Sequence, residues 1–213
     1  AVGQTIATLS HHVKNILQGV RGGSYLINLG LEDHDDQLIR KGWGIVDRNQ
    51  ERIYELVMDM LTYSTERVPA WQDVQVNTVV TDACEMLQVR AEEGRVKLSC
   101  GASAEATVAE CDPDAIHRAV LNVVINAIDA VEGQPAARVD VSTGVDLDAG
   151  WVFVDVQDNG PGIPPDQIQR VFSLFTSTKG ARGTGLGLAV SRKIIEEHDG
   201  QIHVENRADS GCR

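Results

Sequence analysis

Two glycine-rich segments and a pair of asparagines are the residues of this chain best suited to hold a phosphorylated ligand. Asp158-Asn-Gly-Pro-Gly162 follows an apolar, β-branched run, and only glycine lets a backbone approach a flat ring or turn with a positive φ. Gly183-Thr-Gly-Leu-Gly-Leu188 precedes a helical pattern, so its amides and the helix N-terminus can bind phosphate oxygens. Asn122 and Asn126 stand four residues apart on an apolar helical pattern, which places both amides on one side. Taken singly, these are also an ordinary turn, a glycine loop and two polar residues on a partly exposed helix face.

A second candidate for chemistry is the segment Ser10-His-His-Val-Lys-Asn15, which lies within a heptad pattern of apolar residues. With Val13 at position a, His11 falls at f and His12 at g, so His11 faces away from the apolar seam. An exposed imidazole can act as a nucleophile. For a lone histidine the alternative is a solvated surface residue.

In this order the four motifs resemble the catalytic core of a sensor histidine kinase, and the resemblance covers nearly the whole chain. It implies that His11 accepts a phosphoryl group from ATP, that Lys14 offers countercharge, and that a response-regulator aspartate then receives the group. Asn15 occupies the position of a polar residue that can orient water for dephosphorylating that regulator. His12 stands where the family usually has an acidic residue, and it is expected to accept a hydrogen bond from Nδ1 of His11 more weakly than a carboxylate would.

The same resemblance implies an ATP site in which Asp158 accepts the exocyclic amine of adenine. Asn126 is expected to bind Mg²⁺ and Asn122 to join the network around the phosphates; amide oxygens are hard ligands that suit this ion. Lys179 and Arg182 are the cations expected to reach the γ-phosphate, with solvated loop charges as the alternative. Phe172 and Phe175 are expected to anchor a short lid, with ordinary core packing as the alternative. Besides Asp158, Asn122 and Asn126, the full set of expected ATP-binding residues is Gly160, Gly162, Phe172, Thr178, Lys179, Gly183, Thr184, Gly185, Leu186 and Gly187.

The histidine segment lies on the first of two expected helices. Heptad rows run from Val2 to Leu31, break at Glu32–Asp36 and resume up to a boundary near Pro69. Because two helices bury too little apolar surface alone, two hairpins are expected to form a homodimeric four-helix bundle. Four glycines weaken the first helix by about 1 kcal/mol each relative to alanine, which indicates either close packing or a bend. They are Gly19, Gly22, Gly23 and Gly30.

The remainder of the chain predicts strands and helices that do not alternate strictly, which is typical of an α/β sandwich with helices on one face. Helices are expected at Val76–Glu93, Pro113–Val131 and Leu186–His198, and strands at Val96–Cys100, Thr107–Cys111, Arg138–Val145, Trp151–Gln157 and Gln201–Glu205. The expected class is therefore α+β, with a dimerisation and phosphotransfer hairpin at 1–68 and an ATP-binding domain at 69–213. An apolar strand that closes the sheet is expected beyond Arg213.

Composition narrows the partners. A formal net charge of -12 argues against nucleic acid or an anionic membrane, which both require a basic face. The chain shows no apolar run of membrane-spanning length and no signal segment, so a cytoplasmic location without membrane contact is expected. The four cysteines lack metal-binding or framework spacing and are expected to be reduced, and the histidines do not predict a structural zinc site.

Two other functions stay open at the level of sequence. A gyrase-like or chaperone-like ATPase of the same superfamily would need a glutamate in place of Asn122 to activate water, which asparagine cannot do. A degenerate scaffold that binds nucleotide or regulator without turnover is kept open by His12, which replaces the usual acid.

Overall fold

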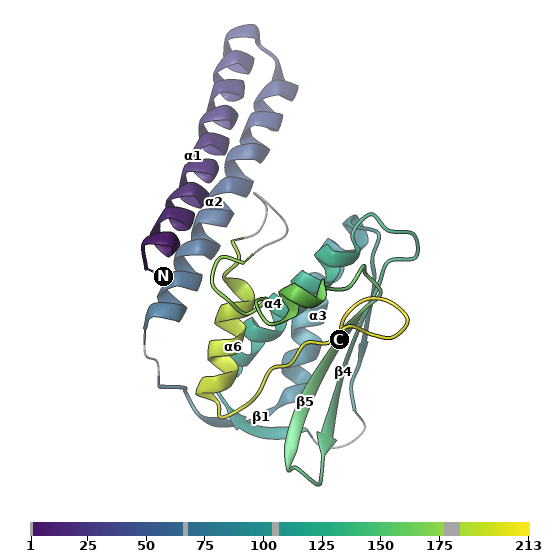
Figure 1. The fold of residues 1–213 in the computed structure, drawn as a ribbon. Coiled ribbons are helices and arrows are strands. Elements are labelled where there is room, and N and C mark those ends of the chain that lie inside the picture. The colour runs from purple at the N-terminus through teal and green to yellow at the C-terminus, as the bar shows by residue number, and fades with distance from the viewer. Residues whose placement is uncertain (1, 66–67, 104–106, 177–183) are drawn as a thin grey trace. The chain divides into compact units, whose positions relative to one another are not determined.

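The computed structural model describes residues 2–65, 68–103, 107–176 and 184–213, with side chains from residue 7 onward. The described chain divides into two compact units. One contains the two N-terminal helices together with the described part of Ser173–Leu186, and the other contains the strands and remaining helices (Figure 1).

The first unit is built on an antiparallel helical hairpin of α1 (Val2–Asp33) and α2 (Asp36–Ser64) (Figure 1). The break between them lies within the predicted turn, and Asp35 caps α2 because its carboxylate accepts hydrogen bonds from the backbone N–H groups of Gln37 and Leu38. The predicted hairpin is therefore confirmed.

Close packing accounts for three of the four glycines of α1. A Cβ on Gly23 would lie 2.7 Å from the carbonyl oxygen of Gly42, and one on Gly30 would lie 2.8 Å from the side chain of Ile39. A Cβ on Gly19 would likewise meet the side chain of Asn49 at 2.5 Å. These glycines let α2 approach the backbone of α1, so the loss in helix propensity is offset by contact area.

The second unit has a three-stranded mixed sheet and a separate two-stranded sheet. In the larger sheet the order is β2–β4–β5, with β2 parallel to β4 and β4 antiparallel to β5. The smaller sheet pairs β1 with β3 in antiparallel register. The strands are β1 (Gln72–Gln75), β2 (Lys97–Gly101), β3 (Val108–Cys111), β4 (Arg138–Asp146) and β5 (Trp151–Asp158).

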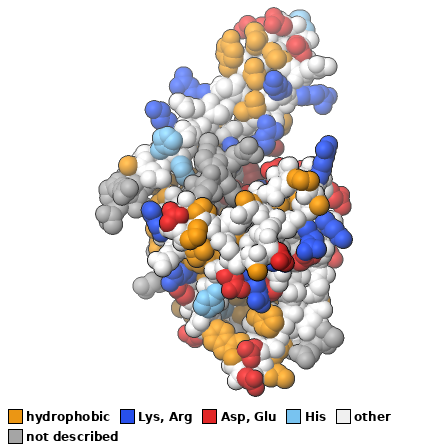
Figure 2. Space-filling model, turned by 45° about the vertical axis from the view of Figure 1, so that its right-hand side comes forward, with side chains coloured by type: hydrophobic (Ala, Val, Ile, Leu, Met, Phe, Trp, Pro, Cys, Tyr) orange, Lys and Arg blue, Asp and Glu red, His pale blue; other side chains and the backbone are white. Residues whose placement is uncertain are grey.

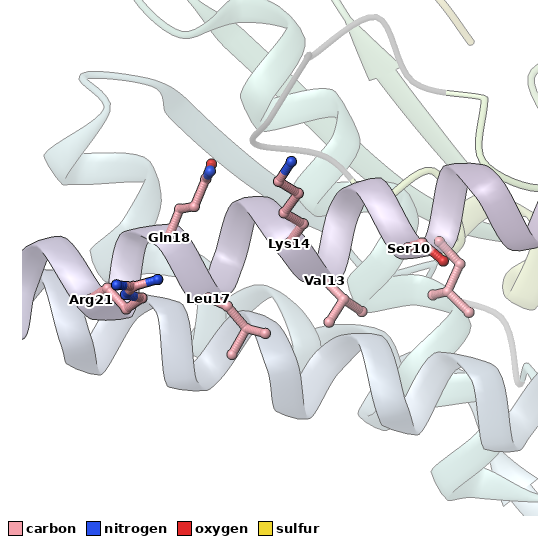
Figure 3. A pocket seen from close by; sticks show the side chains of 7 residues that line it. Ser10, Val13, Lys14, Leu17, Gln18 and Arg21 are labelled. Atoms are coloured by element: carbon pink, nitrogen blue, oxygen red, sulfur yellow. The ribbon is translucent and has the colours of Figure 1, made fainter.

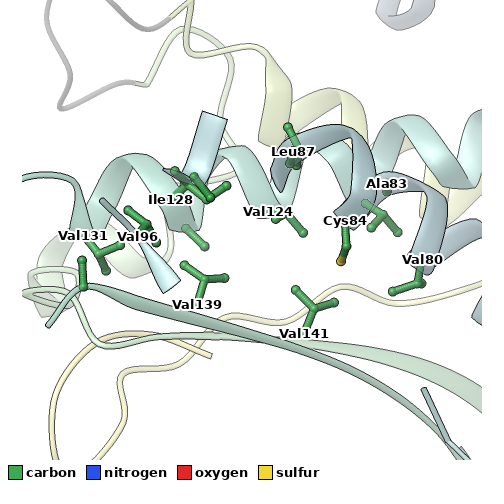
Figure 4. Close-up of a cluster of buried hydrophobic side chains, with 14 of the residues drawn as sticks. Val80, Ala83, Cys84, Leu87, Val96, Val124, Ile128, Val131, Val139 and Val141 are labelled. Carbon is green, nitrogen blue, oxygen red and sulfur yellow. The ribbon is translucent and has the colours of Figure 1, made fainter. Parts of the chain in front are cut away.

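Helices α3 (Val76–Glu93) and α4 (Pro113–Val131) pack on the larger sheet, and both have the predicted bounds. Asp112 caps α4 by accepting from the Ala115 N–H at 3.1 Å, and Pro113 occupies the first helical turn. The apolar faces of both helices meet the strand side chains Val139 and Val141 in one core (Figure 4). The remaining helices are α5 (Pro165–Ile168) and α6 (Gly187–Glu197).

The structure departs from the sequence prediction at Gln201–Glu205, which does not form a strand of either sheet. The chain turns back on itself at Gly211, where φ is 85°, so that Glu205 and Arg213 exchange two backbone hydrogen bonds of 2.9 and 2.8 Å. The predicted strand was therefore wrong, and Glu205 pairs with Arg213 rather than with a strand of a sheet.

Candidate functional site

His11 lies on the exposed surface of α1, as the heptad phase predicts. Its Nδ1 is 3.3 Å from Nδ2 of Asn15, one helical turn further on. The adjacent ring of His12 is tilted by 57°, with its centroid 6.4 Å away. Residues four apart share a helix face whereas neighbours point about 100° apart, so the structure places Asn15 against Nδ1 of His11.

His12 is half-buried and packs edge-on against Phe175, with ring centroids 6.2 Å apart and planes at 76°. Both residues belong to the first unit. Burial lowers the pKa of His12, and the charge of His11 lowers it further. His12 is therefore biased toward its neutral form, in which one ring nitrogen can accept a hydrogen bond.

A shallow depression lies on the surface of α1, and Figure 3 shows the side chains that line it. Val13 and Leu17 supply apolar surface, and Lys14 and Arg21 supply positive charge. Its lining residues are Leu9, Ser10, Val13, Lys14, Leu17, Gln18 and Arg21.

In the second unit, Asn122 of α4 contacts the start of α6, and Asn126 lies one helical turn further along α4. Nδ2 of Asn122 donates to the carbonyl oxygen of Gly187 at 3.2 Å, and Nδ2 of Asn126 donates to the backbone oxygen of Asn122 at 2.8 Å. A Cβ on Gly187 would lie 3.5 Å from the Asn122 side chain. These bonds engage the amide nitrogens, so the amide oxygens form the other end of each side chain and are the atoms suited to a hard cation.

Asp158 ends β5 and is buried, with 7% of its surface exposed. Its Oδ1 accepts from the backbone N–H of Gly160 at 2.8 Å and of Cys212 at 3.3 Å. A Cβ on Gly160 would stand 2.8 Å from the same oxygen, which explains why glycine is required there. Because both bonds use Oδ1, the carboxylate is held in one orientation and Oδ2 is the oxygen that can serve a ligand.

Two further predicted residues of the second unit have defined surroundings. Gly162 has a φ of 76°, and the next residue, Ile163, is held by Asn206, whose Oδ1 accepts from the Ile163 N–H at 2.8 Å and whose Nδ2 donates to the Ile163 carbonyl at 2.7 Å. The ring of Phe172 lies under the guanidinium of Arg192 from α6, at 6.0 Å. Phe172 is thus held against α6 by a cation–π contact.

Thr184, Gly185 and Leu186 belong to the first unit. The carbonyl of Gly185 accepts from the Phe175 N–H at 2.8 Å, and Leu186 is buried against Ile16 and Leu56. Their predicted role at the phosphates stays a prediction. Thr178, Lys179, Arg182 and Gly183 lie outside the described residues.

Sequence reasoning did not foresee that the segment around Cys212 closes against Asp158. The Asp158 N–H donates to the Cys212 carbonyl at 3.0 Å, in addition to the bond from the Cys212 N–H to the carboxylate. The two residues are more than fifty positions apart, and no local pattern marks such a contact.

Within the described ranges, no group of three His, Cys, Asp or Glu side chains is arranged to hold a metal ion.

The second unit is a known type of ATPase domain. Residues 111–213 match the family described as histidine kinase-, DNA gyrase B- and HSP90-like ATPase. Together with the helical hairpin, this match identifies the chain as a sensor histidine kinase catalytic core. The predicted resemblance and fold class are confirmed.

Particular relatives support this assignment over nearly the full chain. AtoS of Escherichia coli K12, a signal transduction histidine-protein kinase, is 28% identical over 211 residues, which are 99% of this chain and 34% of that protein. The sensor histidine kinase ZraS of Salmonella typhimurium is 29% identical over 217 residues, covering 100% of this chain and 44% of that protein. The chain thus spans less than half the length of either relative.

Solved structures show the same architecture. The nucleotide-free catalytic domain of the histidine kinase ThkA is 28% identical with a TM-score of 0.58, covering 67% of this chain and 91% of that one. Full-length ShkA in complex with AMPPNP has a TM-score of 0.71 at 24% identity, covering 98% of this chain and 44% of that one. ThkA in complex with the response regulator TrrA has a TM-score of 0.66 at 24% identity, covering 98% and 61%. The last two establish the fold of both units.

Among the described helices, none has the length and apolar character needed to cross a bilayer.

Proposed function

We propose that this chain binds ATP, transfers its γ-phosphoryl group to His11 and passes that group to an aspartate of a response-regulator receiver domain. The observation that carries the proposal is the arrangement of the second unit. Asn122 and Asn126 lie one turn apart on α4, Asn122 bonds the first residue of α6, and a buried, oriented Asp158 ends β5, within a domain of an ATPase family. We place the activity in the cytoplasm, where ATP is available.

Asp158 would select adenine. Its Oδ1 is occupied by backbone donors, so Oδ2 would accept from the exocyclic amine, which guanine lacks at that position. Gly160 and Gly162 would let the backbone approach the ring. Phe172, held by Arg192, would cover it.

The two amides would face the triphosphate. Asn126 would contribute its oxygen to Mg²⁺, which when bound neutralises phosphate charge, and Asn122 would fix the start of α6 through Gly187. The N–H groups of the first turn of α6 favour anions, so Gly187 lies where phosphate oxygens would be stabilised. Lys179, Thr178, Gly183 and Thr184 complete the proposed set.

In the transfer step, a ring nitrogen of His11 attacks the γ-phosphorus, the bond to the β,γ-bridging oxygen breaks, and ADP leaves. Asn15 contacts Nδ1 of His11 and would hold the ring in place. Lys14, on the same exposed surface, would offset the charge of phosphohistidine. After the phosphoryl group has passed to the regulator, Asn15 would orient water for its hydrolysis, which would give a phosphatase activity.

The hairpin is proposed to dimerise through the domain assigned to residues 1–68, with 69–213 as the kinase domain. Val13 is 38% exposed and Leu17 49% exposed, and Figure 2 shows further apolar side chains on the hairpin surface. Exposed apolar side chains along a helical hairpin are typical of an interface. Similarly exposed are Tyr25, Leu31, Trp43, Tyr54, Val57, Met60, Leu61 and Tyr63.

Neither alternative function explains both the residues of the proposed ATP site and the contact between His11 and Asn15. An ATPase clamp would need a carboxylate base, and Asn122 supplies an amide engaged with Gly187. A scaffold without turnover would not need the oriented contact between His11 and Asn15.

The test is incubation with γ-labelled ATP and Mg²⁺, followed by acid or base treatment of the protein. Phosphohistidine predicts protein-bound label that survives base and is lost in acid. Release of free phosphate without labelled protein would favour the ATPase clamp, and nucleotide binding without either product would favour the scaffold. Asp140→Asn, a change in a partly exposed carboxylate of β4, is the matched control and should label normally.

A further inference from the structure

Two cysteines face each other across the interface between α3 and the edge strand β2. Cys84 lies on α3, 5% exposed, within the main core. Figure 4 shows its sulfur directed from the helix toward the strands that carry Val139 and Val141. Cys100 lies on β2, which is at the edge of the sheet, and it is exposed.

The strand register brings Cys100 to the same place. Cys100 pairs directly with Val141 of β4, and paired residues of neighbouring strands point to the same face. Leu98, two positions earlier on β2, packs against the core that contains Cys84. Since alternate side chains share a face, Cys100 points toward α3 and stands at the open margin of that core.

The surroundings of the two thiols differ in a way that orders their reactivity. Burial raises the pKa of Cys84 to about 12, and the neighbouring thiol of Cys100 adds to the shift. The Cys84 thiol is therefore a poor first nucleophile. Cys100 is accessible to a dissolved oxidant, and any oxidised product on its sulfur would form beside Cys84.

We propose that Cys84 and Cys100 are an oxidation-sensitive pair, which a peroxide converts to a disulfide that ties α3 to β2. The Cys100 thiolate attacks one peroxide oxygen, the O–O bond breaks, and the departing hydroxide takes a proton to give water and a sulfenic acid. The Cys84 sulfur then loses its proton and attacks the Cys100 sulfur, the S–O bond breaks, and a second water leaves. Two thiols lose two hydrogen atoms while the peroxide is reduced to two waters.

The other two cysteines provide internal controls. Cys111 is buried in a separate cluster with Val74 and Val79. Cys212 lies beside Asp158, whose charge adds to burial in raising the pKa of its thiol. Neither belongs to the core that contains Cys84. The proposal does not depend on the kinase activity, so its failure would leave the proposed function untouched.

The test treats the reduced full chain with one molar equivalent of hydrogen peroxide, blocks remaining thiols with N-ethylmaleimide and maps peptides by mass spectrometry. Trypsin must be combined with a glutamate-specific protease, because trypsin alone leaves Cys100 and Cys111 in one peptide. Glu105 and Glu110 lie between them. The expected dominant product is a Cys84–Cys100 linked peptide that dithiothreitol releases.

Cys100→Ser, at an exposed position, should abolish the linked peptide without unfolding the chain, whereas Cys212→Ser should retain it. The thermal unfolding midpoint of the oxidised wild-type chain should be higher than that of the reduced chain, because the disulfide constrains the unfolded state. Cys100→Ser should show no such rise after peroxide treatment. Sulfinic acid on Cys100 with Cys84 still reduced would overturn the proposal. So would a disulfide joining Cys100 of two chains, or links distributed equally over all four cysteines.

Discussion

Replacing Asp158 by asparagine should invert the preference of the nucleotide site without disturbing its shape. The carboxylate Oδ1 accepts from the N–H groups of Gly160 and Cys212 at 2.8 and 3.3 Å. In Asp158→Asn the amide oxygen must keep this place, because an NH₂ group would oppose two donors. The amide nitrogen then faces the ligand, and it presents a donor to the exocyclic amine of adenine.

The expected loss of ATP affinity has two causes, the lost hydrogen bond to the carboxylate and the two donors that then face each other. A hydrogen bond to a charged acceptor contributes about 1.5–3 kcal/mol, and an unsatisfied buried donor costs about 1–3 kcal/mol more. The sum of about 2.5–6 kcal/mol weakens ATP binding by at least about sixtyfold, since 1.4 kcal/mol is tenfold in Kd. Inosine triphosphate carries an acceptor at the same ring position, so its affinity for Asp158→Asn should rise relative to ATP.

Isothermal calorimetry with β,γ-imido analogues of both nucleotides measures this exchange, and Asp140→Asn serves as the control. The melting curve of Asp158→Asn should stay close to that of the wild type, because both backbone bonds to Oδ1 survive. Unchanged ATP affinity, or equal weakening of the adenine and hypoxanthine nucleotides, would refute the assignment of Asp158 to the base.

Three further outcomes are expected. Val13→Lys should convert the chain from a dimer to a monomer, as measured by light scattering at micromolar concentration. The control variant Gln37→Lys, at the hairpin turn, should keep a mass near twice 23.1 kDa. A monomeric wild-type chain would contradict the proposed bundle. Asp112→Ala should lower the free energy of unfolding by about 2–3 kcal/mol, because its carboxylate caps α4 and also accepts a hydrogen bond from the Ala70 N–H at 3.1 Å. Urea denaturation measures this loss, with the exposed Asp114→Ala as the control. Equal losses in the two variants would show that Asp112 is not a stabilising cap. Burial lowers the pKa of His12 below its usual value of 6.5, so at acidic pH the unfolded chain binds a proton at this residue more readily than the folded chain does. The free energy of unfolding should therefore decline as the pH falls below 6.5, whereas His12 should not reduce it above that pH. An NMR titration midpoint of His12 at or above 6.5 would show that its burial is wrong, and His11→Ala should raise the midpoint part of the way.

Local signals predicted the elements whose ends are set by nearby residues. Asp112 and Pro113 marked the start of α4, and the structure begins it there because the cap and the fixed φ of proline act within one turn. The heptad rows located α1 and α2 because a long amphipathic period is hard to mistake. β1 was not predicted, since four residues with one buried side chain carry no detectable alternation.

Contacts between distant segments were beyond such reasoning. The periodicity of α4 predicted that Asn122 and Asn126 share a face, but the bond from Asn122 to the Gly187 carbonyl comes from the packing of α4 against α6. Similarly, His198 accepts from the Asp112 N–H at 3.0 Å and lies against Trp71, with ring centroids 5.1 Å apart. Only the folded chain joins these positions.

The central claim, that His11 is the phosphoacceptor, is tested most directly by locating the phosphoryl group by mass spectrometry after incubation with ATP and Mg²⁺. We predict modification of His11 alone and its complete loss in His11→Gln. His12→Glu and His12→Ala should both retain the product, because Asn15 rather than His12 contacts Nδ1 of His11. A phosphoryl group on His12, or full autophosphorylation of His11→Gln, would contradict the account.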